Sequence, residues 1–125
     1  MKAFSELSLR YYQPAEIEFP ETTVYIAGYT CYDNVDTQSI IIPGSVETID
    51  DYAFYAMAAD EILLGNGIQH IGAYAFYDTE IEELFIPDSV KWLGFEFCQE
   101  GVQLTGQPSE NCHWETEDEF EERTE

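Results

Sequence analysis

The stretch that decides the fold is IPGSVETIDDYAFY at residues 42–55, because it returns at a constant distance along the chain. It aligns with GNGIQHIGAYAFY at 65–77 and with IPDSVKWLGFEFC at 86–98, which gives a period of 22 residues. A weaker copy, FPETTVYIAGYTCY at 19–32, lies upstream at a spacing of 23. The chain therefore contains about three and a half units of one repeat.

The repeat is structural, since its apolar positions recur in step. Four columns are apolar in each of the three strong copies: Ile40, Ile62 and Leu84; Ile42, Leu64 and Ile86; Val46, Ile68 and Val90; Ile49, Ile71 and Leu93. A fixed period in the low twenties is typical of a solenoid, in which each unit buries its apolar side only against its neighbours. Phe54 and Phe76, from the shared word YAFY, are accordingly expected in the core.

Each unit contains signals for two short extended pieces and one turn. The segments SIIIP, EILLG and ELFIP read as strands that stop at Pro or Gly, because Pro cannot donate to the next step of a ladder. The segments SVETI, GIQHI and SVKWL predict a second extended piece, and DYAFY predicts a tight, 3₁₀-like turn. Each coil is expected to wrap once per repeat.

This pattern of an I-x-I-P strand, then S-V-x-x-I, then Gly or Asp, then Y-A-F resembles the BspA-like leucine-rich repeats. Residues 40–98 carry the resemblance strongly and 17–39 carry it weakly. It implies a right-handed leucine-rich-repeat solenoid with short parallel β-strands, used to bind other proteins and without catalytic activity. Many members of the family are long secreted arrays with adhesive roles, whereas this chain is short and strongly acidic.

The two ends of such a stack need caps, because each exposes core and unpaired backbone. We predict a repeat domain over residues 1–107, with caps at about 1–16 and 95–107. The residues expected to build these caps are Leu7 and Leu9 at the start and Phe95, Phe97, Val102 and Leu104 at the end. Residues 108–125 have little to bury and are predicted to form an acidic, flexible tail.

Composition fits one globular domain with an unusual surface. Of 125 residues, 45% are apolar and 15% aromatic, which is enough for a real core. The chain carries 26 acidic and 4 basic residues, a formal net charge of −22, and residues 1–109 alone hold 18 acids and 3 bases. Such a surface repels nucleic acid and anionic membranes and attracts basic partners.

Neither the start of the sequence nor its cysteines point to a particular function. The start, MKAFSELSLRYYQPAE, has no apolar run like that of a signal peptide, and no segment approaches the roughly 18 apolar residues of a membrane span. We therefore expect a cytoplasmic protein. The three cysteines, Cys31, Cys98 and Cys112, include no CxxC pair, so neither a disulfide framework nor a zinc site is expected.

The residue between two inward residues of a strand points outward. Ile41, Leu63 and Phe85 should therefore form an apolar stripe on the outer sheet face, beside the carboxylates of Asp60, Glu61, Glu82 and Glu83. An apolar stripe with a charged rim is typical of a protein-binding face. The alternative is that these side chains only satisfy strand propensity or are covered by a cap. A second outward column, Tyr25, Thr48, His70 and Trp92, offers Trp92 as a partner-binding anchor.

The sequence contains no pattern that favours catalysis. His70 and His113 are the only histidines, and neither belongs to a nucleophile or HExxH motif. Glu82 and Glu83 are adjacent on a predicted strand and should point to opposite faces, so they are not expected to form an acid–base pair. No calcium loop of the DxDxDG type occurs. We expect a non-enzymatic protein with no cofactor and no metal site.

Two kinds of function remain open. The first is a module that docks a basic protein, in its sharpest form a nucleic-acid mimic of the anti-CRISPR or anti-restriction type, carried by a phage or mobile element. Duplex DNA carries one charge per about 1.7 Å, so 22 charges match roughly 37 Å of duplex, about the width of such a domain. The second is an adhesive or scaffolding repeat protein whose acidity serves only solubility. The stripe or an open strand end could also pair two copies.

Overall fold

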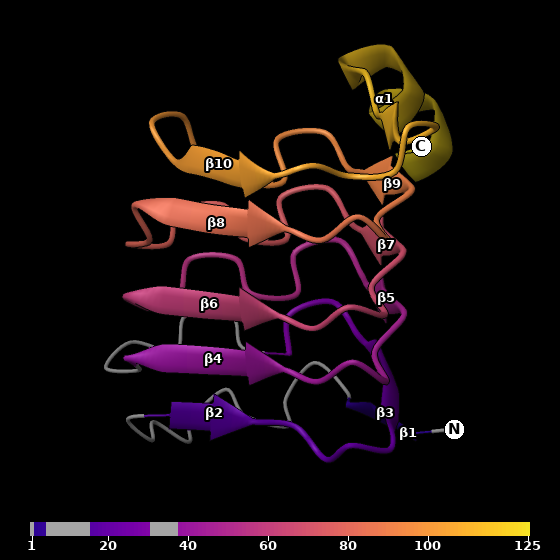
Figure 1. Ribbon diagram of the computed structural model, residues 1–125. Coiled ribbons are helices and arrows are strands. Elements are labelled where there is room, and N and C mark those ends of the chain that lie inside the picture. Colours follow the sequence, from indigo (N-terminus) through magenta and orange to yellow (C-terminus); the bar gives the residue numbers. More distant parts are fainter. Residues whose placement is uncertain (1, 5–15, 31–37) are drawn as a thin grey trace.

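The fold is a stack of parallel β coils, seen in a computed structural model that describes residues 2–4, 16–30 and 38–125 (Figure 1). It makes about four turns with a spacing of about 22 residues, which confirms the predicted solenoid. One side, here called the strand face, carries β2 (Glu16–Glu18), β4 (Ser39–Ile42), β6 (Glu61–Leu64), β8 (Glu83–Ile86) and β10 (Gln103–Gly106).

The other side of the stack is one six-stranded sheet in the order β1-β3-β5-β7-β9-β11. Its strands are β1 (Lys2–Phe4), β3 (Thr23–Ile26), β5 (Thr48–Ile49), β7 (His70–Ile71), β9 (Trp92–Leu93) and β11 (His113–Trp114). Every pair in it is parallel, and the register places Ile49 beside Ile71 and Ile71 beside Leu93. The predicted second extended piece of each unit is therefore present.

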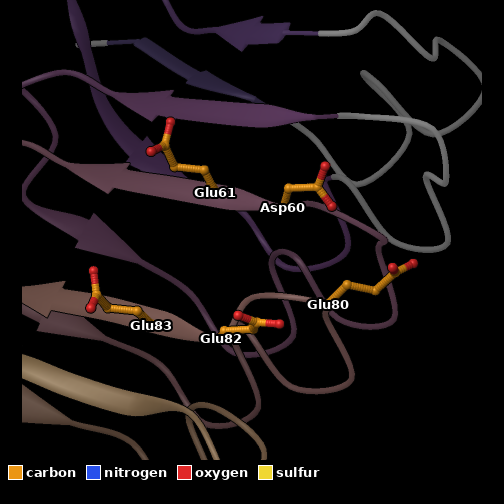
Figure 2. Close-up of a pocket in the computed structure, with 5 residues that line it drawn as sticks. All are labelled: Asp60, Glu61, Glu80, Glu82 and Glu83. Carbon is orange, nitrogen blue, oxygen red and sulfur yellow. The ribbon is translucent and has the colours of Figure 1, made fainter.

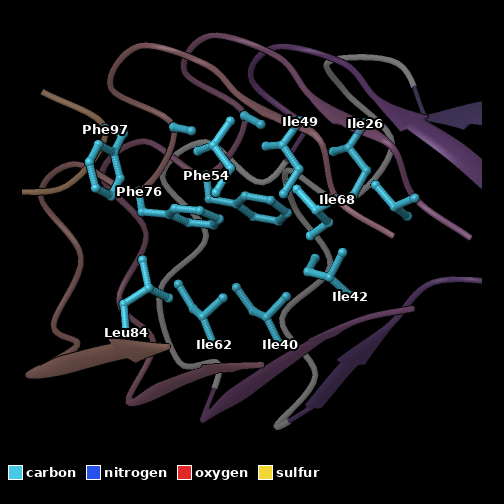
Figure 3. Packing of buried hydrophobic residues seen from close by; sticks show 14 of the residues in the cluster. Ile26, Ile40, Ile42, Ile49, Phe54, Ile62, Ile68, Phe76, Leu84 and Phe97 are labelled. Atoms are coloured by element: carbon cyan, nitrogen blue, oxygen red, sulfur yellow. The ribbon is translucent and has the colours of Figure 1, made fainter. Parts of the chain in front are cut away.

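The core runs along the axis of the stack between the two sides. Ile40, Ile62 and Leu84 of the strand face are buried, as are Ile49 and its equivalents opposite. Between these rows the rings of Phe54 and Phe76 stack 5.4 Å apart with no exposed surface (Figure 3). Their assignment to the core is confirmed.

The coils change direction at a turn that holds a tyrosine in the left-handed region. Tyr29, Tyr52 and Tyr74 have φ values of 61°, 62° and 56°, and Glu96 follows in the same column at 51°. Bulky residues adopt this conformation only at a cost, typically of about 1–3 kcal/mol, that neighbouring contacts must offset. Here the tyrosine rings stack at 5.3 and 5.2 Å, so each ring is supported by the coil next to it. The segment DYAFY forms the predicted tight turn, in which the nitrogen of Ala53 donates to the carbonyl of Asp50 and that of Tyr55 donates to the carbonyl of Tyr52.

Two glycines allow the coils to approach closely beside that turn. A Cβ on Gly72 would lie 2.4 Å from the backbone nitrogen of Asp51, and one on Gly94 would lie 2.2 Å from that of Ala73. Both distances are shorter than any real contact, so these positions require Gly. The side chain of Asp51 uses the same gap, since its Oδ1 accepts a hydrogen bond from the nitrogen of Ala73 at 2.8 Å.

The C-terminal part differs from the sequence-based expectation. The segment expected as a cap contributes β10, which pairs with β8 as a further strand of the stack. Beyond Pro108, where a flexible tail was predicted, β11 pairs with β9 and is followed by helix α1 (Glu117–Thr124). The helix lies at the end of the stack in Figure 1 and is eight residues long. No helix among the described residues is long and apolar enough to cross a bilayer.

Charge explains why this acidic segment folds. Arg123 of α1 donates to Asp51 at 2.7 and 3.0 Å and to Glu115, whose side chain is buried. Thr116 and Glu119 form a capping box that satisfies free backbone groups at the start of α1. The sequence showed one base among eight acids here, but not that this base would contact Glu115 of the same segment and Asp51 of an earlier coil. Leu7, Leu9 and the predicted N-terminal cap lie mainly outside the described residues.

Candidate functional site

The predicted apolar stripe lies on the outside of the strand face. Leu63 and Phe85 are 47% and 54% exposed, and Ile41 is half-buried. The register places Ile41 beside Leu63. At the two ends of the stripe, the equivalent positions are occupied by Glu18, which pairs with Ile41, and by Thr105, which pairs with Phe85. Alternation along each strand therefore positions these side chains outward, as the sequence predicted.

The four predicted carboxylates lie together beside the stripe. They line a hollow of about 480 Å³ formed by Asp60, Glu61, Glu80, Glu82 and Glu83 (Figure 2). Glu61 and Asp60 come from the start of β6 and the residue before it, and Glu83 and Glu82 occupy the equivalent places at β8. No basic residue of the described part of the chain lines this hollow, so its potential is strongly negative.

Sequence reasoning missed Glu80 and was wrong about the directions of Glu82 and Glu83. Alternation applies only within a strand, and β8 begins at Glu83, so Glu82 belongs to the preceding loop. The loop turns this carboxylate into the hollow that Glu83 also lines. The signal for Glu80 was present in the sequence, because it also precedes β8 in the same short acidic run.

The sheet on the strand face is interrupted at this acidic hollow. β2, β4 and β6 form a three-stranded sheet, whereas β8 pairs only with β10 among the described strands. Glu61 and Glu83 lie at equivalent positions of the two strands that flank the interruption. Like charges opposite one another disfavour strand pairing, and these two carboxylates lie where the ladder is missing.

Further carboxylates lie at the opposite ends of the strands. Ile41 borders a hollow of about 290 Å³ that also contains Glu18 and Glu21. Phe85 borders another of about 490 Å³ that contains Asp88. The apolar stripe is therefore rimmed by acidic side chains at both of its long edges.

Trp92 lies away from the stripe, on the six-stranded sheet. Its ring is 5.6 Å from that of His70 and 4.8 Å from that of His113, so it is held within a stack. Its Nε1 is buried without a hydrogen-bond partner. Burial is also the main cause that lowers the pKa of His70. The structure confirms the column Thr48, His70 and Trp92 and extends it to His113, but it does not join Trp92 to the other predicted residues.

A fourth hollow, not foreseen from the sequence, lies on the turn side of the stack. It measures about 560 Å³ and is lined by Tyr74, Tyr77, Phe95, Glu96, Gln99 and Glu100. Burial raises the pKa of Tyr74, and the negative charge of Glu96 raises it further. A phenol with a raised pKa stays protonated at neutral pH and keeps its ability to donate.

Reactive groups are sparse in the part of the chain that the structure describes. Burial, followed by the charge of Glu96, raises the pKa of the Cys98 thiol to about 11, which makes it a poor nucleophile at neutral pH. Cys112 also has a raised pKa because it is buried, and Cys31 lies outside the described residues. No group of three or more His, Cys, Asp or Glu side chains among the described residues is arranged to hold a metal ion.

Comparison with known families agrees with the geometry of the coil. The model of the BspA type leucine-rich repeat region matches residues 1–102 in six copies. No curated protein and no solved structure matches the chain. The match covers most of the sequence and contains the repeat, the stripe and strands β1 to β9, whereas β10, β11 and α1 lie beyond it. The chain belongs to the BspA-type leucine-rich repeat family.

Proposed function

We propose that this protein binds a partner with a basic surface through its strand face. Leucine-rich repeat solenoids are typically protein-binding modules and are generally not catalytic. The observation that carries the proposal is the position of Leu63 and Phe85, both about half exposed, beside a hollow lined by five carboxylates.

The two parts of this surface have different roles. Burial of the Leu63 and Phe85 side chains against a partner supplies affinity, at about 25 cal/mol for each Å² of apolar surface removed from water. The carboxylates supply selection, because they raise the rate of encounter with basic surfaces and penalise acidic ones. Binding should therefore have an apolar part that resists salt and an ionic part that salt screens.

The sharper form of the proposal is a nucleic-acid mimic that occupies the basic channel of a nucleic-acid-binding enzyme and inhibits it. It is supported by the net charge of −22 and by the gathering of five carboxylates in one hollow. A mimic of phosphate would lose affinity steeply between about 50 and 200 mM salt, as nucleic acid does. A partner bound mainly through the stripe would lose much less.

The test is affinity capture from a cell lysate at low salt with three forms of the protein. The wild type is compared with a double variant, Leu63→Glu with Phe85→Glu, and with a control, Gln69→Glu with Asn111→Glu, which adds the same charge at exposed positions elsewhere. The double variant should lose its partner by about 100-fold while melting within a few degrees of the wild type. The control should bind within about twofold.

Two outcomes would contradict parts of the proposal, and a third would support its sharper form. Equal capture by the double variant would remove the strand face as the interface. Capture of cell-wall or extracellular proteins would favour an adhesive role and remove mimicry. Enrichment of nucleic-acid-binding enzymes that dissociate steeply with added salt would support the inhibitor form.

A further inference from the structure

The tyrosine column on the turn side ends at Tyr74, where the ring of Phe120 packs against it at 5.6 Å and 65°. The rings of Tyr29, Tyr52 and Tyr74 are parallel within 9° and stack at 5.2–5.3 Å. In the next coil the same backbone conformation is occupied by Glu96, which carries a carboxylate in place of a ring. The turn-side hollow opens beside Tyr74 at this change of residue type.

The chemistry of the hollow suits a cation. The ring of Tyr77 lies 5.2 Å from that of Tyr74 at 72°, and the ring of Phe95 lies 5.9 Å from it at 85°. Aromatic faces attract cations, and Glu96 and Glu100 add two exposed carboxylates. Gln99 is occupied elsewhere, because its Nε2 donates to the carbonyl of Thr79 at 2.6 Å.

The molecule already binds one guanidinium in this way. The central carbon of Arg123 lies 5.2 Å from the centre of the Phe120 ring, and the same side chain donates to the carboxylates of Asp51 and Glu115. An aromatic face with two carboxylates is therefore a demonstrated arginine site in this chain. The turn-side hollow has the same components, but none of its six lining residues is basic.

We propose that the turn-side hollow binds an arginine side chain of a partner protein. The planar guanidinium would stack on the ring of Tyr77 and donate to Glu96 and Glu100, because Phe120 already packs against the rings of Tyr74 and Phe95. Arginine suits this geometry better than lysine, since it combines stacking with paired donors, whereas an ammonium is a strongly hydrated point charge. The site lies on a different side of the coil from the stripe and does not depend on the function proposed for the strand face.

The test is a titration followed by the ring signals of Tyr77 and Phe95 in nuclear magnetic resonance spectra. The probes are acetyl-Gly-Arg-Gly-amide and two analogues with lysine or citrulline at the centre, citrulline being a neutral isostere of arginine. The arginine peptide should produce saturable shifts, the lysine peptide weaker binding, and the citrulline peptide none. Glu96→Gln with Glu100→Gln should weaken arginine binding by about tenfold or more.

A matched variant, Glu47→Gln with Glu110→Gln, removes two exposed carboxylates outside both proposed sites and should bind the arginine peptide within about twofold. An equal loss in this variant would reduce the effect to general charge attraction and overturn the site. Equal shifts with citrulline, stronger binding of lysine, or no shifts with arginine would also overturn it. The Leu63→Glu with Phe85→Glu protein should give the wild-type titration, so the two proposals fail separately.

Discussion

The two sides of the coil share the same 22-residue period, but their strands pair differently. The six-stranded sheet runs without a break from β1 to β11, and its last strand leads into α1, which Arg123 fastens to Asp51. The strand face is interrupted between β6 and β8, and it ends at β10 with Leu104 39% exposed. One side is a continuous sheet, and the other is interrupted.

The difference separates stability from binding. On the six-stranded side, outward residues such as His70, Trp92 and His113 stack on one another. On the strand face, Leu63 and Phe85 stay exposed and acidic residues crowd one hollow, although both features disfavour the isolated fold. The strand face is therefore where an external partner is expected, because its exposed apolar side chains and crowded carboxylates lower the stability of the isolated protein.

The largest effect should come from comparing two phenylalanines nine positions apart. Phe76→Ala should lower the free energy of unfolding by about 3–5 kcal/mol, because its ring is fully buried and stacks on Phe54. Phe85→Ala should change it by less than about 0.5 kcal/mol, since that ring faces solvent. Urea unfolding of both variants checks this. A large loss for Phe85→Ala would mean that the stripe supports the fold.

The next largest effect concerns the ion pairs that hold α1 to the six-stranded side of the stack. Arg123→Gln should lower stability by about 1–3 kcal/mol, because the buried carboxylate of Glu115 loses its cation. This expected loss of stability is smaller than the loss for a fully buried ion pair, because Arg123 is itself partly exposed. Amide hydrogen exchange in α1 and β11 should accelerate at least about tenfold, while exchange in β4 and β6 stays unchanged.

Lys91→Gln is the matched control for this variant, since it removes an exposed positive charge elsewhere in the last coils. Its exchange pattern should equal that of the wild type. Slow exchange of α1 in the Arg123→Gln protein would show instead that the Thr116 capping box and Phe120 hold the helix unaided.

The smallest effect concerns the missing strand pairing between β6 and β8 on the strand face. Glu61→Gln with Glu83→Gln should raise the free energy of unfolding by about 0.5–1 kcal/mol at low salt, because two like charges beside the gap are removed. The gain should shrink as salt screens the charges in the wild type. Glu110→Gln with Glu121→Gln is the control for net charge. An equal gain in the control would mean that repulsion at the hollow does not divide the sheet.

Much of this architecture could be predicted from periodicity. Burial must repeat with the coil, so Ile40, Ile62 and Leu84 could be placed inward and Leu63 and Phe85 outward from spacing alone. The C-terminal segment could not be predicted in this way. Its only base, Arg123, reaches Asp51 across 72 residues, and no local pattern announces such a contact.

The sequence by itself determined the period, the inward columns and the sign of the surface charge, because these depend on local spacing and composition. The tertiary structure alone decided that β6 and β8 do not pair, that Glu80 joins the predicted carboxylates in one hollow, and that another hollow opens beside Tyr74. Each of these depends on how loops from successive coils turn relative to one another. Loops lack the strict alternation of strands, so their side-chain directions follow from packing between coils.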